Sequence, residues 1–448
     1  MNGPTPAPAG PVAEGFPSDA VRDRARRGTA AVFPPLDAYG STLFGADPAR
    51  PALWADPLDA FRLVPPVFMP QRLEKLVDLA REPVHHDVEL TSAFGGFAAT
   101  APVYLSAFGS TRIAGGDLGL AASRQAGRLG IPMVVGENIV PVEGYGRSDG
   151  TGGEDGEKAE RMLLARLHAY LGDVPDGVGG VVVQQSTEDA DAEVWNLVHS
   201  DPGAAPLLDT GRLAFELKVG QGAKPGLGGM TVLPRAQAAR VSGQYTVDGS
   251  LDADGERLLR CSSPGTFTDE ILRQQIRLMR NNFPRVKVWV KLPPGRDVGA
   301  AARVAWESGA DAVTVDGAEG GSGWAPTAFL DHVGLPLGEC LRRVGRPEHD
   351  LLASGRMWEG TRAVKALALG ARAVGLGRAA LVAVAEDPEN GLVRLVEALA
   401  LELRLLVSAV GKYRVGDLAP EDLWSPAGDV PVEAPTALVP GGVPGGAP

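Results

Sequence analysis

Eight short apolar runs, each ending in glycine or in polar residues, constrain the fold of this chain more than any other feature. Most of them are separated by stretches with the periodicity of helices. Uninterrupted apolar runs of this length are typical of strands that are buried on both faces, and their alternation with helices indicates a parallel sheet. The runs span residues 103–107, 133–137, 181–186, 213–221, 286–292, 312–317, 351–355 and 373–378.

The intervening segments complete a repeating strand–helix pattern. Helices are predicted over residues 116–129, 157–171, 269–281, 298–309 and 359–370. Eight such units predict an α/β protein with a (β/α)₈ TIM barrel. A doubly wound open sheet is the alternative, but no GxGxxG follows the first run to favour it.

The chain divides into four segments by composition. Residues 1–18 and 428–448 are rich in Pro, Gly and Ala, and they predict disordered tails because they offer little apolar surface to bury. Residues 19–95 predict an N-terminal helical cap with a helix near 71–81, and residues 96–427 predict the barrel.

Charge and cysteine content exclude several functions. The net charge is −12, from 55 acidic and 43 basic residues, which argues against a nucleic-acid partner and an anionic membrane surface. Two cysteines, Cys261 and Cys340, are too few to ligate an iron–sulfur cluster, so no metal site is expected. The chain shows neither a signal peptide nor an apolar run long enough to span a membrane, and we expect a cytoplasmic protein.

In a (β/α)₈ barrel the active site is built where the strands end, so the residues that close each run are the candidates. Polar side chains at strand ends also occur simply because they meet water. Here, however, carboxamides, lysines and carboxylates would converge on one mouth. They are Glu137, Gln184, Gln185, Ser186, Lys218, Gln221, Lys224, Lys291, Asp316, Glu319 and Ser354.

Glycines are concentrated after four of the runs. The segment GQGAKPGLGG at 220–229 places five glycines around Lys224, which lets backbone N–H groups approach a ligand unless it is merely a surface turn. Gly355, Gly375 and Gly377 follow or end the last two strands, where barrels commonly bind phosphate, although packing glycines would look the same.

These segments carry a resemblance to a known family. KVGQGAKPGLGG, DGAEGGSGWAP and ASGRMWEGTRAVKALALGARAVGLGRAAL occur in the order of the signatures of the flavin-binding synthase domain of glutamate synthase. GGFAATAPVYLSAFGS and VVGENI resemble the first strand of that domain and the turn after its second strand. The similarity runs from about Gly95 to Trp424, and its most specific part is the glycine-rich run that begins at Lys218.

The resemblance implies an FMN-binding barrel that acts on the C–N bond of an amino or imino acid. By position, Lys291 would face the N1/O2 edge of the flavin, and Ser106 and Gln185 would touch its ring. Glu137, Lys218, Gln221 and Lys224 would be catalytic, binding substrate carboxylates and supplying protons. The FMN phosphate would be surrounded by Gly320, Gly321, Gly355, Gly375, Gly377 and Arg378, and Ser354 would also bind the cofactor.

The sequence also departs from the family. The cysteine cluster that usually follows the last glycine-rich strand is absent, as is the glutamine-hydrolysing domain with its N-terminal cysteine, which predicts a stand-alone synthase domain. The turn GENIVP at 136–141 and the loop CSSPGTFTDE at 261–270 differ from the family pattern, which leaves the substrate open.

Three functional hypotheses follow. The first is an FMN-dependent oxidoreductase of amino-acid or specialised metabolism that acts on an amino, imino or 2-oxo acid. It would need a separate electron donor or acceptor, and the oligomeric state, including a homo-oligomer, is open. The second keeps the FMN barrel but oxidises a 2-hydroxy acid or reduces an enoate. The third is a non-catalytic flavin-binding subunit, against which the four residues Lys218, Gln221, Lys224 and Lys291 argue together.

Overall fold

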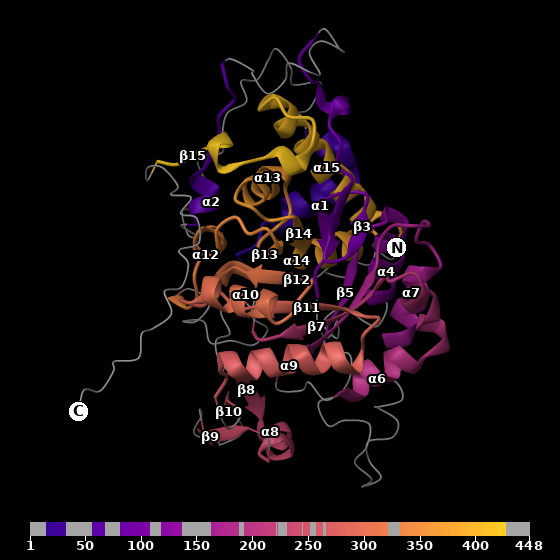
Figure 1. Ribbon diagram of the computed structural model, residues 1–448, viewed down its shortest axis with the longest axis vertical. Helices are drawn as coiled ribbons and strands as arrows, with labels where there is room; N and C mark the ends of the chain where they lie inside the picture. Colours follow the sequence, from indigo (N-terminus) through magenta and orange to yellow (C-terminus); the bar gives the residue numbers. More distant parts are fainter. Residues whose placement is uncertain are drawn as a thin grey trace, which may run out of the picture.

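The eight apolar runs form a closed barrel of parallel strands (Figure 1). The strands are β4 (Val103–Leu105), β5 (Met133–Val135), β6 (Val181–Ser186), β7 (Leu213–Lys218), β11 (Lys287–Leu292), β12 (Ala312–Asp316), β13 (Asp350–Ser354) and β14 (Ala373–Leu376). β14 pairs with β4 and so closes the ring. The predicted TIM barrel is therefore confirmed, and an open sheet is excluded because the ring has no edge strand.

The computed structural model describes most of the chain outside its ends and several loops. The described residues are 15–32, 56–67, 81–107, 118–136, 163–187, 192–220, 222, 231–243, 245–250, 257–262, 266–320 and 332–426. Both predicted tails fall almost entirely outside these ranges. The predicted helix at 71–81 also lies outside them except for its last residue.

Helices follow most of the strands, as the sequence predicted. The described helices after β4 are α4 (Leu118–Leu129), one at 163–171, α6 (Ala192–Ser200), α7 (Ala205–Asp209), α8 (Arg235–Val241), α9 (Asp269–Asn282), α10 (Val298–Glu307), α12 (Leu337–Val344), α13 (Gly360–Ala368), α14 (Arg378–Glu386) and α15 (Gly391–Ala409). Single 3₁₀ turns occur at η1 (Gly28–Val32), η4 (His85–Asp87), η7 (Pro202–Ala204), η8 (Ala318–Gly320), η9 (Val415–Asp417) and η10 (Pro420–Asp422). No helix in the described part of the chain has the length and apolar character needed to cross a membrane.

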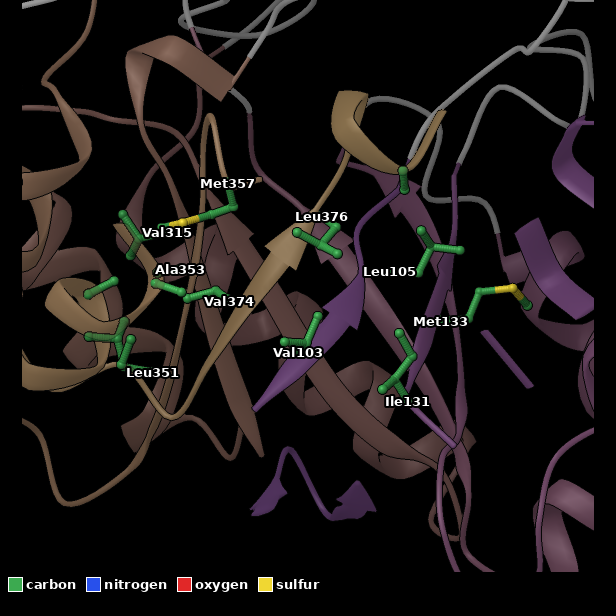
Figure 2. Close-up of a cluster of buried hydrophobic side chains, with 14 of the residues drawn as sticks. Val103, Leu105, Ile131, Met133, Val315, Leu351, Ala353, Met357, Val374 and Leu376 are labelled. Atoms are coloured by element: carbon green, nitrogen blue, oxygen red, sulfur yellow. The ribbon is translucent and has the colours of Figure 1, made fainter. Parts of the chain in front are cut away.

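The outer face of the barrel packs against these helices. Alternate residues of each strand point outward, because successive side chains of a strand lie on opposite faces. Figure 2 shows this layer: Val103 and Leu105 come from β4, and Val374 and Leu376 come from the neighbouring β14. All four are at most 1% exposed, so the apolar runs are explained by burial between barrel and helices.

A hairpin closes the N-terminal end of the barrel. Strands β2 (Ser92–Phe94) and β3 (Phe97–Ala99) are joined by Gly95 and Gly96, and Phe94, Phe97 and Ala99 pack inside the ring. The Trp289 indole donates a hydrogen bond to the Gly95 carbonyl at 2.9 Å, and the Gly95 N–H donates to the Asp350 carboxylate at 2.7 Å. One inward residue from every strand completes this floor: Tyr104, Val134, Val182, Ala214, Trp289, Ala312, Leu352 and Ala373.

The N-terminal segments pack against the C-terminal ones. Helix α1 (Ser18–Arg27) contacts α14 and α15, and α2 (Pro57–Ala60) contacts α12 and α13. The short strand β1 (Arg62–Leu63) pairs with β15 (Leu423–Trp424), so an N-terminal segment meets the C-terminal end of the described chain there. The boundary expected between residues 95 and 96 falls within the turn of the β2–β3 hairpin, which fills the barrel floor.

A three-stranded antiparallel sheet was not predicted. It consists of β8 (Thr231–Pro234), β10 (Arg257–Ser262) and β9 (Thr246–Ser250), in that order, and it is inserted between β7 and α9. In Figure 1 it lies with α8 beyond α9, at the lower end of the view. The Arg260 guanidinium stacks on the Tyr245 ring, 4.4 Å from its centroid.

The hairpin floor yields a first prediction. A Cβ on Gly95 would lie 2.3 Å from the Trp289 ring, and Gly95 has a φ of +59°, so Gly95→Ala is both strained and obstructed. We expect it to lower the free energy of unfolding by about 2 kcal/mol or more. Gly177→Ala is the control, since Gly177 has a φ of +78° with nothing within 4 Å of its Cβ position. Urea unfolding of both variants measures the difference, and equal losses would contradict a role for the ring contact.

Candidate functional site

Above the apolar floor, the inside of the barrel becomes polar. The strands that end with polar residues direct every second side chain inward, so these residues meet in one buried layer. Each is between 1% and 7% exposed: Gln184, Ser186, Glu216, Lys218, Lys291, Thr314, Asp316 and Ser354. Buried charges are costly unless they are paired, so the contacts within this layer indicate how the site is organised.

Asp316, the last residue of β12, joins three parts of the predicted site. One carboxylate oxygen accepts a hydrogen bond from the Ser354 hydroxyl at 2.7 Å. The other oxygen accepts from the Gly222 N–H at 3.1 Å and lies 3.6 Å from the Lys291 ammonium. A Cβ on Gly320 would lie 2.3 Å from the Asp316 carboxylate, so a side chain there would displace it. One carboxylate thus binds Lys291, Ser354 and Gly222 and lies against Gly320.

Glu216 is the second buried carboxylate and lies nearer the floor, on β7. The Gln184 amide donates to one of its oxygens, and the Thr314 hydroxyl donates to the other at 3.3 Å. Burial raises the pKa of Glu216, while Lys291, Gln184, Thr314 and Lys218 oppose that rise. Lys218 and Lys291 are register partners on neighbouring strands, so both cations lie at the level just above Glu216.

Tyr104 links the floor to the polar layer. Its ring packs among the floor residues, and its hydroxyl lies beside Thr314 and Ser354. This buried hydroxyl lacks a hydrogen-bond partner with good geometry, and burial raises its pKa further above the ordinary tyrosine value. A buried polar atom of this kind is costly unless a ligand or water meets it.

The C-terminal ends of β12, β13 and β14 form a glycine-lined cradle. Gly355 has a φ of +128°, and a Cβ on it would lie 3.1 Å from the Gly317 nitrogen. Gly377 precedes α14 without any side-chain cap, and the space beside it is open. The Arg378 guanidinium donates to the Glu319 carbonyl, and burial lowers the pKa of Arg378. Free N–H groups at a helix start beside an arginine suit an anionic ligand.

The predicted site residues fall into three groups. Those gathered in the interior layer or the cradle are Lys218, Lys291, Gly320, Ser354, Gly355, Gly375, Gly377 and Arg378. Two more, Ser106 and Gln185, adjoin these groups. The Ser106 N–H donates to the Leu376 carbonyl at 3.0 Å. The Gln185 amide donates to the Gln184 carbonyl at 2.9 Å, and it is the Gln184 amide that reaches Glu216. Glu137, Gln221, Lys224 and Gly321 lie outside the described residues.

A buried ionic cluster borders the cradle. Arg362 of α13 is 2% exposed and contacts Asp56 at 2.5 Å, Asp59 at 3.0 Å and the Glu319 carboxylate. Burial and the neighbouring Asp56 raise the pKa of Glu319 to about 8, and Arg362 opposes that rise. Burial works to raise the pKa of Asp56 as well, but Arg362 and the Glu319 hydrogen bond outweigh it and lower that pKa. The two shifts go in opposite directions, so the pair favours a proton on Glu319 and a charged Asp56.

Asp56, Glu216 and Tyr104 were not predicted as site residues, although Asp316 and Glu319 stood among the polar strand ends. Glu216 had a usable signal, because alternation along LAFELK places it on the same face as Lys218. Among the described residues, no group of three His, Cys, Asp or Glu side chains is placed to bind a metal. Cys340 is buried, and that burial raises its pKa.

The fold and this interior define a (β/α)₈ barrel whose inside is apolar at its N-terminal end and charged toward its C-terminal end, where glycines and an arginine line the strand ends. The model of the conserved region in glutamate synthase matches residues 156–386, just over half of the chain. The chain therefore belongs to the glutamate synthase family.

Several relatives share part of the chain. An archaeal glutamate synthase [NADPH] of Methanocaldococcus jannaschii is 36% identical over 180 residues, which cover 38% of this chain and 34% of that protein. A glutamate synthase large subunit-like protein of Rhizobium meliloti is 33% identical over 183 residues, covering 39% and 40%. The matches thus span a third to two fifths of the length of these relatives.

Solved structures agree with the barrel fold. A mutant of (S)-mandelate dehydrogenase superposes with a TM-score of 0.53 at 19% identity, covering 92% of this chain and all of that one. A lactate oxidase of Pediococcus acidilactici gives a TM-score of 0.54 at 15% identity, covering 92% and 95%. At these identities the likeness concerns the fold.

The raised pKa of Glu319 predicts a pH-dependent stability. Folded Glu319 keeps its proton up to about pH 8, whereas an ordinary glutamate loses it near 4.5, so the free energy of unfolding falls as the pH rises between those values. Glu319→Gln keeps a neutral donor at every pH. We expect its stability relative to the parent to rise from pH 5 to 8 and then to level off, as measured by urea unfolding.

The control is Glu339→Gln. Hydrogen bonding to Arg342 lowers the pKa of Glu339 to about 2, so the parent and this variant should differ by a constant amount above pH 5. A constant difference for Glu319→Gln as well would show that Glu319 is ionised at neutral pH.

Proposed function

We propose that this chain is an FMN-dependent oxidoreductase that acts on the C–N bond of an amino or imino acid. The observation that carries the proposal is the convergence of Lys291, Ser354 and the Gly222 N–H on the buried carboxylate of Asp316. Membership of the glutamate synthase family supports both the cofactor and the reaction class.

The described residues fit the two ends of FMN. Gly377 leaves open space at the start of α14, Gly320 and Gly355 line the neighbouring strand ends, and Arg378 adds a positive charge, which suits the phosphate. Lys291 would serve the pyrimidine edge of the flavin, where a cation stabilises negative charge on the reduced ring. Asp316 holds the Lys291 ammonium in place, because the two groups lie 3.6 Å apart in a dry interior.

The substrate would lie above the flavin at the mouth of the barrel. Lys218 is 7% exposed, at the end of β7, and offers a cation for a substrate carboxylate. Gln221 and Lys224 follow it in the glycine-rich run, and Glu137 follows β5; we assign them to the same task by their position in the sequence. A lysine with a neighbouring cation and little water is also suited to proton transfer.

The chemistry divides between the cofactor and the chain. FMN supplies reversible two-electron transfer, and the C–N bond gains or loses one hydride and one proton. The chain orients the substrate by its carboxylate, excludes water from the interior layer and moves the proton at the nitrogen through Lys218 or Lys224. Asp316 acts on this chemistry only through Lys291, which makes it a positioning residue.

Purification with FMN tests the proposal. We expect about one non-covalent FMN per chain, because the strand ends provide one cradle. We also expect amino acids added under anaerobic conditions to bleach the flavin absorbance. Titration with 2-hydroxy acids in parallel tests the alternative chemistry. Bleaching by a 2-hydroxy acid alone would replace the C–N assignment, and failure to reconstitute with FMN would remove the flavin assignment.

Lys218→Met and Lys224→Met test the assignment of the two lysines. Each variant should keep the FMN spectrum and lower turnover by about 100-fold, because a charge clamp or proton donor is lost. The matched control is Lys287→Met, at the opposite end of β11 beside Gly96. Turnover equal to that of the parent in both Lys218→Met and Lys224→Met would move the substrate away from this mouth.

A further inference from the structure

Arg362 joins two of the loops that form the cradle. Its Nε donates to the Gly355 carbonyl at 3.3 Å, and its Nη2 donates to the Glu319 carboxylate. Glu319 directly precedes Gly320, and its own carbonyl accepts from Arg378. The Arg362 guanidinium, which is 2% exposed, is therefore linked directly to Gly355. It is linked through Glu319 to Gly320 and Arg378.

The guanidinium is oriented from the N-terminal side of the chain. The Asp56 carboxylate, which is 4% exposed, contacts Arg362 at 2.5 Å. The other Asp56 oxygen accepts from the Leu58 N–H at 3.1 Å and from the Gly338 N–H at 2.9 Å. The backbone N–H groups of Leu58 in α2 and Gly338 in α12 thus fix Asp56, and its carboxylate orients the Arg362 guanidinium.

The other charges around this contact do not replace Asp56. Asp59 also contacts Arg362, but its side chain is 36% exposed and it pairs with Arg356 at 2.7 Å. Burial and the neighbouring Asp56 raise the pKa of Glu319 to about 8, which weakens its negative charge as a partner for Arg362. Asp56 is then the main buried counter-charge of Arg362, and removing it would leave that arginine poorly paired.

We propose that Asp56 is a positioning residue of the cofactor site, acting through Arg362 on the phosphate cradle. This inference rests on the proposed function, because it assigns the cradle to the FMN phosphate. Without Asp56 the guanidinium would reorient toward Asp59, and the turn at 318–320 and Gly355 would lose their common partner. The contact that Lys291 would make with the flavin ring depends on Asp316 and would be unaffected.

The experiment compares two ligands that differ only by the phosphate. The protein is stripped of flavin, and FMN and riboflavin are each titrated by fluorescence quenching against the parent and Asp56→Asn. We expect the dissociation constant for FMN to rise by about 10–100-fold, the range for losing an outer partner of a binding group. The riboflavin constant should stay within about twofold, because its contacts are held elsewhere.

A matched control separates positioning from general stability. Asp422 forms a buried pair with Lys412 at 2.5 Å and accepts from the Ala419 N–H at 2.7 Å, in the C-terminal segment. Asp422→Asn should lower the melting temperature and leave the ratio of FMN to riboflavin affinity as in the parent. Arg362→Lys keeps the charge but cannot reach three partners at once, so it should lower the ratio of FMN to riboflavin affinity. It replaces Asp56→Asn in the experiment if that variant does not fold.

The outcomes separate the two proposals. An unchanged affinity ratio in Asp56→Asn, or in Arg362→Lys where only that variant folds, overturns the positioning role while the proposed function stands. Equal weakening of FMN and riboflavin overturns it too, because the whole site would then have moved. A parent protein that binds neither flavin overturns both proposals.

Discussion

The ion pair between Lys291 and Asp316, 3.6 Å apart inside a closed barrel, is the interaction on which the site depends. Each of these charges would be costly in such a dry interior without the other. Asp316 spreads its charge further over the Ser354 hydroxyl and the Gly222 N–H, so three strand ends and one loop share a single carboxylate. A shift of the Asp316 carboxylate would therefore alter the contacts of each of these segments.

The hairpin floor makes this charged layer possible. Phe94, Phe97 and Trp289 fill the N-terminal half of the barrel and separate the polar layer from solvent at that end. Among the described residues, the polar strand ends therefore face the C-terminal side of the barrel, opposite this floor. The glycine at position 95 belongs to the same arrangement, because only a residue without a Cβ fits beneath the Trp289 ring.

The sequence predicted the barrel well, because every strand is buried on both faces and leaves an uninterrupted apolar run. Its strand ends were less accurate: the runs at 133–137 and 213–221 end as strands at Val135 and Lys218. Gly136, Val219 and Gly220 continue the runs in the sequence but lie outside the strands. The hairpin floor and the β8–β10–β9 sheet were missed, because their antiparallel strands stand outside the repeating parallel strand–helix pattern on which the prediction relied.

The site was predictable in part for a similar reason. Residues at strand ends follow from topology alone, so Lys218, Lys291 and Ser354 could be chosen from the sequence. Asp56 could not, because it meets Arg362 across 306 positions of the chain and no local pattern marks it. The predicted motifs identify groups that face the mouth, whereas the partners that fix them come from segments with no recognisable pattern.

The balance of charge inside the barrel bears on what it can bind. The chain carries a net charge of −12, which by itself would repel an anionic ligand. Within the polar layer Lys218 and Lys291 lie near Glu216 and Asp316; burial raises the pKa of Glu216, and both lysines oppose that rise. Asp316 pairs with Lys291. Coulomb interactions are strongest at short range and in a buried site, so the placement of an anion at the mouth depends on these two lysines more than on the net charge of the whole protein.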